Sequence, residues 1–199
     1  MLIVGLTGGI ASGKSTVSLL LKNKGAVIID ADEISRNILI PGKPAWTKVI
    51  EHFGEKVLRD DKNIDRKKLA QIVFSDKKEL ELLNSITHPI IIEEIKRQLE
   101  YYKKEDEEVV VIDAALLLEL GLNSLVDEVW VVAVDEKTQL ERLMLREKNL
   151  SRKEALKRIK SQMPLQDKLK YAQRIIDNTG EIERTKKQLD EIWRGILKS

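Results

Sequence analysis

The feature that most constrains the fold is a glycine-rich stretch near the start of the chain, Leu2–Thr16. It combines a short apolar run, a loop and the beginning of a helical pattern. The loop fits the phosphate-binding pattern G-x-x-x-x-G-K-[ST], whose fixed positions are Gly8, Gly13, Lys14 and Ser15. A strand before the loop and a helix after it are the context that this pattern requires, so the stretch predicts a phosphate site on an α/β sheet.

The residue types in the loop explain how it binds phosphate. Glycines let the backbone adopt conformations in which successive N–H groups point at phosphate oxygens, and the helix start adds more N–H groups. Lys14 supplies positive charge for the β- and γ-phosphates, and the Ser15 hydroxyl can ligate Mg²⁺. The alternatives are an ordinary glycine turn and a dinucleotide loop, and no G-x-G-x-x-G occurs in the chain. The predicted ATP-binding residues of the loop are Gly8, Gly9, Ile10, Ala11, Ser12, Gly13, Lys14, Ser15 and Thr16.

Composition excludes several classes of protein. The 199 residues are 42% hydrophobic, which is enough for one α/β domain with inserted subdomains. The absence of cysteine excludes disulfides and thiol catalysis, and two histidines are too few for a histidine-rich metal site. The chain starts directly with a strand pattern and has no apolar run of membrane-spanning length. We therefore expect a cytoplasmic protein that does not associate with membranes.

Four further apolar runs predict strands, and the chain ends in a predicted helix at residues 181–197. Most of these runs end in a residue with a side-chain carboxylate or amide. In open α/β sheets, ligands bind beyond the carboxyl ends of the strands. The predicted strands are Ala26–Asp30, Glu107–Asp113, Val129–Val134 and Arg174–Asn178.

The second run ends in two carboxylates, Asp30 and Asp32. At the end of a strand near the phosphate loop, such groups are suited to proton transfer or metal contact. The structural alternative is that Asp32 is the N-cap of a helix over residues 33–39. The third run ends in Asp113, a Walker-B-like position from which a carboxylate holds Mg²⁺ through its water shell.

Residues 45–104 carry helical patterns with breaks at Gly54 and at residues 59–63. Asp65 resembles the N-cap of a helix over residues 66–74, and Thr87-His88-Pro89 suggests the start of another helix. Taken alone, a histidine such as His88 is more often structural than functional. This region is interpreted as a helical insertion that carries the acceptor site.

Residues 142–174 are strongly basic, with eleven lysines and arginines against three acidic residues. Arg142 and Arg146 are four residues apart on a predicted helix that begins at Glu136, and Ser151 begins a capping box for the next helix. A helical hairpin with arginines over bound phosphates is typical of a kinase lid. The alternatives are a solvated basic face and a nucleic-acid patch, which would be expected to contain interleaved aromatic residues.

Together these motifs make the chain resemble the dephospho-coenzyme A kinase family over nearly its whole length. The motifs that carry the resemblance are residues 6–16, 30–36, 41–45, 53–54, 65–66, 88–89 and 176–180, with Arg146 and residues 158–162.

The resemblance implies a fold and a reaction. The fold is a three-layer α/β core of the P-loop NTPase type, with a five-stranded parallel sheet, a helical substrate-binding insertion and a helical lid. The implied domains are a core at 1–35, 105–141 and 172–199, a CoA-binding insertion at 36–104 and a lid at 142–171. The implied reaction moves the γ-phosphate of ATP, with Mg²⁺, to the ribose 3′-hydroxyl of dephospho-CoA, the last step of coenzyme A biosynthesis.

The resemblance also assigns roles to individual residues. Asp32, Lys14 and Arg146 are the expected catalytic residues, with Asp32 as the base and Arg146 as the lid arginine. Asn178 joins the ATP site near the adenine, and Ser15 and Asp113 are the expected metal ligands. The expected substrate-binding residues are Asp32, Arg36, His88 and Glu119. After Asp113 the family usually has D-x-P-L-L-F-E, whereas this chain has Ala115 for proline and Leu118 for phenylalanine.

Three other functions have weaker support. A nucleoside monophosphate kinase would share the core but not the Asp-Ala-Asp and His-Pro motifs. A GTP-binding switch needs N-K-x-D, which is absent from the chain. A nucleic-acid binder using the basic stretch would need no acceptor site. We expect ATP and dephospho-CoA as partners, without nucleic acid; the oligomeric state does not follow from the sequence.

Overall fold

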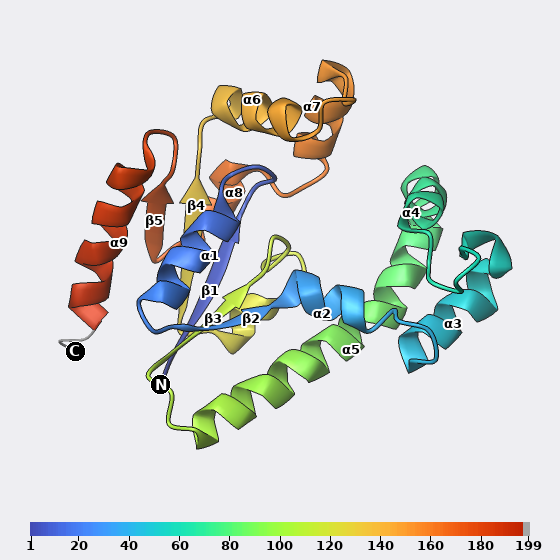
Figure 1. The fold of residues 1–199 in the computed structure, drawn as a ribbon, viewed down its shortest axis with the longest axis horizontal. Helices are drawn as coiled ribbons and strands as arrows, with labels where there is room; N and C mark the ends of the chain where they lie inside the picture. Colours follow the sequence, from blue (N-terminus) through green and yellow to red (C-terminus); the bar gives the residue numbers. More distant parts are fainter. Residues whose placement is uncertain (197–199) are drawn as a thin grey trace. The chain divides into compact units, whose positions relative to one another are not determined.

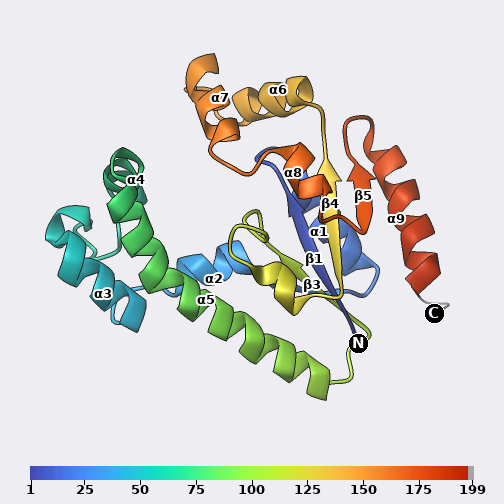
Figure 2. The same cartoon turned by 180° about the vertical axis from the view of Figure 1, so that it is seen from behind.

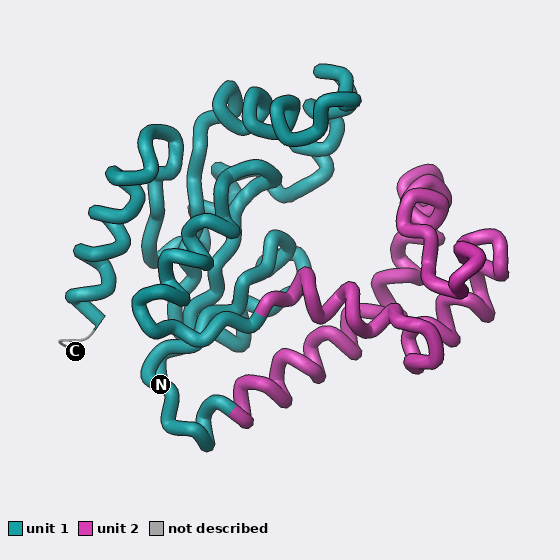
Figure 3. Tube along the Cα trace, viewed as in Figure 1, with its two compact units in different colours: residues 1–29, 102–199 teal, residues 30–101 magenta. Residues whose placement is uncertain are grey.

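A computed structural model describes residues 1–196. The chain divides into two compact units, drawn in teal and magenta in Figure 3: unit 1 is residues 1–29 and 102–199, and unit 2 is residues 30–101. The domain boundaries expected from the resemblance stay a prediction, and residues 197–199 of that prediction lie outside the described part of the chain.

Unit 1 is built on a five-stranded parallel sheet in the order β2-β3-β1-β4-β5, which confirms the predicted α/β class (Figure 1). The first strand is central, and the register pairs Val4 with Val111 of β3 and with Glu128 of β4. Every predicted strand is present within one or two residues of its expected bounds. The strands are β1 (Leu2–Gly8), β2 (Val27–Asp30), β3 (Val109–Asp113), β4 (Glu128–Ala133) and β5 (Arg174–Asp177).

The helices of unit 1 cover both faces of this sheet. Figure 1 shows α1 and α9 on one face, and Figure 2, from behind, shows α8 on the other. The predicted terminal helix is confirmed as α9, although Leu197, its expected end, lies outside the described residues. The helices are α1 (Lys14–Asn23), η2 (Leu122–Leu125), α6 (Glu136–Arg146), α7 (Arg152–Lys160), α8 (Leu165–Leu169) and α9 (Ile182–Ile196).

The core of unit 1 explains why these segments form strands. All five residues of β3 are buried, as expected for a parallel strand covered on both faces. Val17 of α1, Leu189 of α9 and Trp130 of β4 are each fully excluded from solvent in one cluster. Burial of apolar side chains therefore holds α1 and α9 against this face of the sheet. The carboxyl ends of the strands remain available for a functional site.

Unit 2 is helical, as predicted, with breaks close to the expected residues. Asp65 caps α4, because its carboxylate accepts hydrogen bonds from the N–H groups of Lys67 and Lys68 at 3.0 and 3.2 Å. A small core around Val49, Phe53 and Leu69 joins α3 to α4. The elements are α2 (Ala31–Asn37), α3 (Pro44–Phe53), η1 (Glu55–Val57), α4 (Arg66–Ser75) and α5 (Lys77–Lys104), whose last three residues belong to unit 1.

The predicted helix start at Thr87-His88-Pro89 is wrong, because α5 runs through Pro89 without a break. A proline inside a helix removes one backbone hydrogen bond and costs about 3 kcal/mol. Thr87, Ile91, Ile95 and Leu99 are buried at four-residue spacing on both sides of Pro89, so tertiary packing outweighs that local cost.

Among residues 1–196, neither α5 nor any other helix is long and apolar enough to cross a membrane.

The N-cap alternative for Asp32 is also wrong. The cap of α2 is Asp30, whose carboxylate accepts a hydrogen bond from the N–H of Glu33 at 2.8 Å. The chain turns directly from β2 into the helix, so Asp32 lies exposed in the first turn of α2. Its carboxylate is therefore not committed to capping the helix.

Candidate functional site

The phosphate loop joins β1 to α1 and has the backbone shape that the sequence predicted. Ala11 and Gly13 both have positive φ, 58° and 85°, and the N–H of Ser12 donates to the carbonyl of Gly9 at 3.0 Å. Gly13 is the N-cap of α1 and supplies no capping side chain. The start of α1 therefore has the positive dipole end and the N–H groups that bind anions.

Asn178, which follows β5, holds this loop from the side. Its Nδ2 donates to the carbonyl of Ser12 at 2.8 Å, and its Oδ1 accepts from the hydroxyl of Thr185 at 2.8 Å. A Cβ on Gly13 would lie 2.0 Å from the same Nδ2, so only glycine fits there. These contacts account for the buried position of Asn178; its expected adenine contact stays a prediction.

Lys14 and Asp113 are brought together as an ion pair at the ends of α1 and β3. Both side chains are largely buried, with 14% and 7% of their surfaces exposed. The pair places the Walker-B-like carboxylate next to the phosphate loop, and Ser15 lies in the first turn of α1, directly after Lys14. These hard oxygen donors fit Mg²⁺, which usually takes one or two protein oxygens and completes its shell with phosphates and water.

A small cavity of about 50 Å³ lies beside the loop and is lined by Gly9, Ser12, Gln139 and Gln162, among others. The Ser12 hydroxyl is buried, and its oxygen has no hydrogen-bond partner among the described residues. A buried hydroxyl without a partner costs free energy, so the cavity is suited to a polar atom that would complete its bonding.

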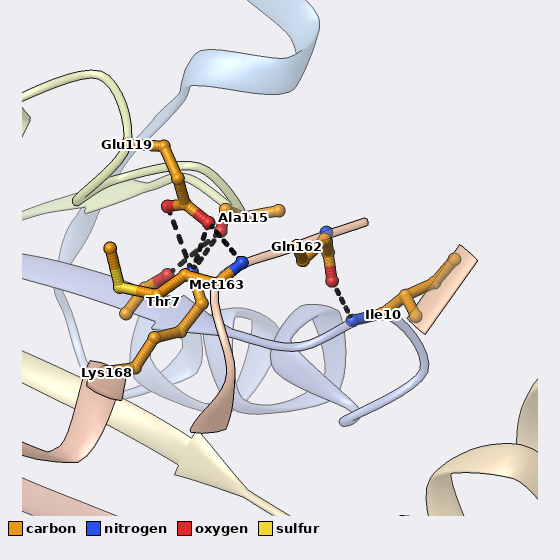
Figure 4. A network of polar contacts seen from close by, with 7 residues as sticks. All are labelled: Thr7, Ile10, Ala115, Glu119, Gln162, Met163 and Lys168. Carbon is orange, nitrogen blue, oxygen red and sulfur yellow. Dashed lines mark hydrogen bonds and ion pairs between the residues drawn. The ribbon is translucent and has the colours of Figure 1, made fainter. Parts of the chain in front are cut away.

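Two glutamines bracket Ile10 in the loop, and sequence reasoning did not assign them a role. The amide oxygen of Gln162 accepts from the N–H of Ile10 at 2.7 Å, as Figure 4 shows. The Nε2 of Gln139 donates to the carbonyl of Ile10, also at 2.7 Å. Both glutamines come from the segment after β4, so the loop's peptide groups are positioned by residues more than 120 positions away. The motif at residues 158–162 was the one signal for Gln162 in the sequence.

The buried Lys168 and the partly exposed Glu119 form a polar network with the segment after α7 (Figure 4). The ammonium of Lys168, with no exposed surface, lies 3.0 and 3.1 Å from the two carboxylate oxygens of Glu119 and 3.0 Å from the carbonyl of Ala115. Glu119 also accepts from the N–H of Met163 at 3.1 Å, and the Thr7 hydroxyl donates to the carbonyl of Ala115 at 3.2 Å. The expected substrate-binding role of Glu119 stays a prediction; its observed contacts tie the loop after β3 to the predicted lid.

The predicted lid residues are helical, and part of their charge is neutralised within the protein. Arg146 ends α6, and its guanidinium shares Glu147 with Arg158 of α7. Arg146 keeps 58% of its side chain exposed. Arg142 lies nearer to the phosphate loop, since its Nη1 is 3.8 Å from a Cβ built on Gly13. The basic stretch therefore includes one arginine beside the loop and one exposed arginine at a helix end.

Three of the four predicted acceptor residues, Asp32, Arg36 and His88, lie in unit 2. Asp32 and Arg36 are four residues apart on α2, which puts them on one face of that helix. Arg36 Nη2 lies 3.9 Å from Asp30 Oδ2. His88 is half-buried on α5, and this burial lowers the pKa of its imidazole below the ordinary value of 6.5. His88 is thus neutral at pH 7, able to donate or accept a hydrogen bond.

Comparison with known proteins gives a consistent result. A family model described as "Dephospho-CoA kinase" matches residues 2–184. The dephospho-CoA kinase of Carboxydothermus hydrogenoformans is 52% identical over 94% of this chain and 90% of its own length. That of Bacillus anthracis is 51% identical over 96% of each chain. The solved structure of dephospho-CoA kinase from Campylobacter jejuni has a TM-score of 0.71 and 32% identity, covering 97% of this chain and 98% of its own.

Proposed function

The chain belongs to the dephospho-CoA kinase family, and from that premise we propose that it transfers the γ-phosphate of ATP to the ribose 3′-hydroxyl of dephospho-CoA. The products are coenzyme A and ADP, and the reaction is the last step of coenzyme A biosynthesis. The observation that carries this proposal is the phosphate loop with Lys14 ion-paired to Asp113. That pair gathers the charge that binds a triphosphate and the carboxylate that serves its Mg²⁺.

On the donor side, phosphoryl transfer depends mainly on positioning and charge stabilisation. The loop N–H groups and Lys14 would hold the β- and γ-phosphates. Ser15 and Asp113 would hold Mg²⁺, which when bound offsets negative charge on the phosphates. Asn178 would lie at the nucleotide end of the site. Arg146 would pair with the transferred group through its planar guanidinium.

On the acceptor side, Asp32 would orient the 3′-hydroxyl and take its proton. An exposed first-turn carboxylate that does not cap its helix can do both. Arg36, His88 and Glu119 would contact the rest of the acceptor. We place the enzyme in the cytoplasm, acting on ATP and dephospho-CoA without nucleic acid.

An assay of ADP release tests the proposal directly. The protein with ATP and Mg²⁺ should form ADP only when dephospho-CoA is added, and AMP should not replace it. Equal turnover with AMP would instead support the alternative, a nucleoside monophosphate kinase. Omitting Mg²⁺ should abolish ADP formation, and Lys14→Ala should remove most of it because that variant lacks the charge on the β- and γ-phosphates. Lys22→Ala, at the exposed end of the same helix, is the matched control.

A further inference from the structure

The two peptide groups that flank Ile10 in the phosphate loop are both held by glutamine side chains. The amide oxygen of Gln162 accepts from the N–H of Ile10, in the peptide that joins Gly9 to Ile10 (Figure 4). The Nε2 of Gln139 donates at 2.7 Å to the carbonyl of Ile10, in the peptide that joins Ile10 to Ala11. A peptide group is planar and trans, so its N–H points away from the side on which its C=O lies. The contact with Gln139 therefore turns the N–H of Ala11 away from this glutamine.

Ala11 has a backbone conformation that alanine rarely adopts. Its φ is 58°, in the left-handed region where the Cβ crowds the backbone. Half a turn of the peptide between Ile10 and Ala11 would bring this φ to about −120°, in the ordinary extended region. The same rotation would put a carbonyl oxygen where the N–H now points. The intrinsic preference of Ala11 thus favours an orientation that would repel a phosphate, and the hydrogen bond from Gln139 opposes it.

Gly9 leaves the space that the amide of Gln139 occupies. A Cβ built on Gly9 would lie 2.5 Å from the Nε2 of Gln139, well inside van der Waals contact. Gly9 does not have the positive φ that Ala11 and Gly13 have, so its backbone conformation is open to alanine. The close approach of Gln139 is therefore what requires glycine at this position.

Gln139 is presented to the loop from a fixed helix start. The carbonyl of Asp135, the N-cap of α6, accepts from the N–H of Gln139 at 3.0 Å. Leu140, the next residue of α6, is buried in a cluster against which Ile10 and Ala11 pack. The helix and the loop are thus held against each other by apolar contacts as well as by the hydrogen bond.

We propose that Gln139 is a positioning residue for phosphoryl transfer, because its hydrogen bond to the Ile10 carbonyl keeps the N–H of Ala11 directed at the phosphates of bound ATP. The inference rests on the proposed function, since it concerns the phosphate donor of that reaction. An N–H directed at a phosphate oxygen makes a charge-assisted hydrogen bond, whereas a carbonyl oxygen in its place would repel the phosphate. The binding conformation of the loop then depends on a side chain 129 positions away.

The first test removes the donor of this hydrogen bond without shortening the side chain. Gln139→Met should weaken binding of the β,γ-imido analogue of ATP, with Mg²⁺, about 10- to 100-fold by calorimetry, as the loss of one charge-assisted hydrogen bond would. The matched control is Gln173→Met, since the amide oxygen of Gln173 accepts from the N–H of Val129 at 2.6 Å near the amino end of β4. This control should lower stability in urea but keep the parent's affinity for the analogue. Equal losses of affinity in the two variants would overturn the proposal.

Two further substitutions separate positioning from a merely structural role. Ala11→Gly removes the cost of the positive φ, so in the Gln139→Met background it should restore part of the lost affinity. Gly9→Ala displaces the amide of Gln139, so it should weaken the analogue by a similar factor. Because both changes break one hydrogen bond, the Gly9→Ala, Gln139→Met double variant should bind no more weakly than either single variant. Additive losses, or no recovery with Ala11→Gly, would contradict the proposed role.

NMR of the ¹⁵N-labelled protein reports the N–H of Ala11 directly. Binding of the analogue should move this amide proton downfield in the parent, because it gains a hydrogen bond to phosphate, and not in Gln139→Met. These measurements need no dephospho-CoA, so the two proposals can fail separately. A parent that binds the analogue in this way but forms no ADP with dephospho-CoA would keep the positioning role and refute the proposed reaction. An active enzyme whose Ala11 proton shifts equally in the parent and in Gln139→Met would refute the positioning role alone.

Discussion

The ammonium of Lys168 and the carboxylate of Glu119 are held together at 3.0 Å, with the lysine side chain fully buried. A buried charge is stable only when it is paired and hydrogen-bonded, and Lys168 meets both conditions through Glu119 and the carbonyl of Ala115. The same carboxylate binds the N–H of Met163, next to Gln162, which reaches Ile10 in the phosphate loop. The ion pair therefore fixes the end of the predicted lid and, through it, one peptide group of the loop.

The first prediction concerns this pair. Glu119→Gln leaves the fully buried ammonium of Lys168 without its counter-charge and should destabilise the protein by about 3 kcal/mol, the lower end for a broken buried pair because Glu119 itself is partly exposed. Urea unfolding measures the change. Lys170→Met, which removes an exposed ammonium paired with Asp167, is the control and should change stability by less than about 1 kcal/mol. Equal effects of the two substitutions would show that burial of Lys168 is energetically unimportant.

The second prediction concerns Gly13. Gly13→Ala forces the backbone of alanine into the left-handed conformation at φ 85°. It also puts the Cβ methyl group 2.0 Å from Asn178 Nδ2. The loop should distort, and ATP affinity should fall at least tenfold, measured by calorimetry. Gly195→Ala, on α9 with open space around it, is the control. It should leave ATP binding unchanged and stabilise the helix by up to about 1 kcal/mol.

The third prediction concerns Asp32. Asp32→Asn keeps the shape and loses the charge, so kcat should fall by about 10²- to 10⁴-fold, the usual contribution of a general base. ATP affinity should change little, because the phosphate loop is untouched. Single-turnover kinetics isolates the transfer step, and Glu33→Gln, beside it on α2, is the control. A transfer rate within a few-fold of the parent would exclude Asp32 as the base.

The fourth prediction concerns Arg146. Lysine cannot form the two parallel hydrogen bonds that a guanidinium forms with a phosphoryl group, so Arg146→Lys should lower kcat substantially. ATP affinity should fall much less. Arg152→Lys, at the exposed start of α7, should be neutral.

Limited trypsin digestion gives an independent check on the predicted lid. Bound ATP should slow cleavage between Arg142 and Lys160 if this segment closes over the nucleotide. Identical cleavage rates with and without ATP would mean that the basic stretch is a solvated face.

The fifth prediction concerns pH. Burial lowers the pKa of His88 below 6.5, so near that pH the unfolded chain binds more protons than the folded chain does. The contribution of His88 to stability is therefore complete above pH 6.5 and is lost as the pH falls below it. In a His52→Gln background, where His88 is the only imidazole, its NMR titration should have a midpoint below 6.5. Replacing His88 by Gln should reduce the loss of stability between pH 7.5 and 5.5.

The sequence by itself determined the phosphate loop, the five strands and several helix starts. Gly8, Gly13 and Lys14 specify the loop because its shape depends on local backbone freedom and on one charge. Asp65 and Ser151 cap α4 and α7 as predicted, since a cap is a contact between residues two or three positions apart. Such features depend on neighbours in the chain and are therefore readable from it.

Tertiary structure decided the features that depend on distant residues. Gln162 reaches Ile10 across 152 positions, and Lys168 meets Glu119 across 49. In the sequence, Lys168 could not be distinguished from the other basic residues of the predicted lid, because no local pattern marks a lysine as buried. Pro89 lies inside α5 against its local preference, because the helix face that carries Thr87, Ile91, Ile95 and Leu99 is buried only in the folded protein. Packing free energy from many distant contacts exceeds the few kcal/mol of local preference, and a pattern of neighbouring residues does not contain it.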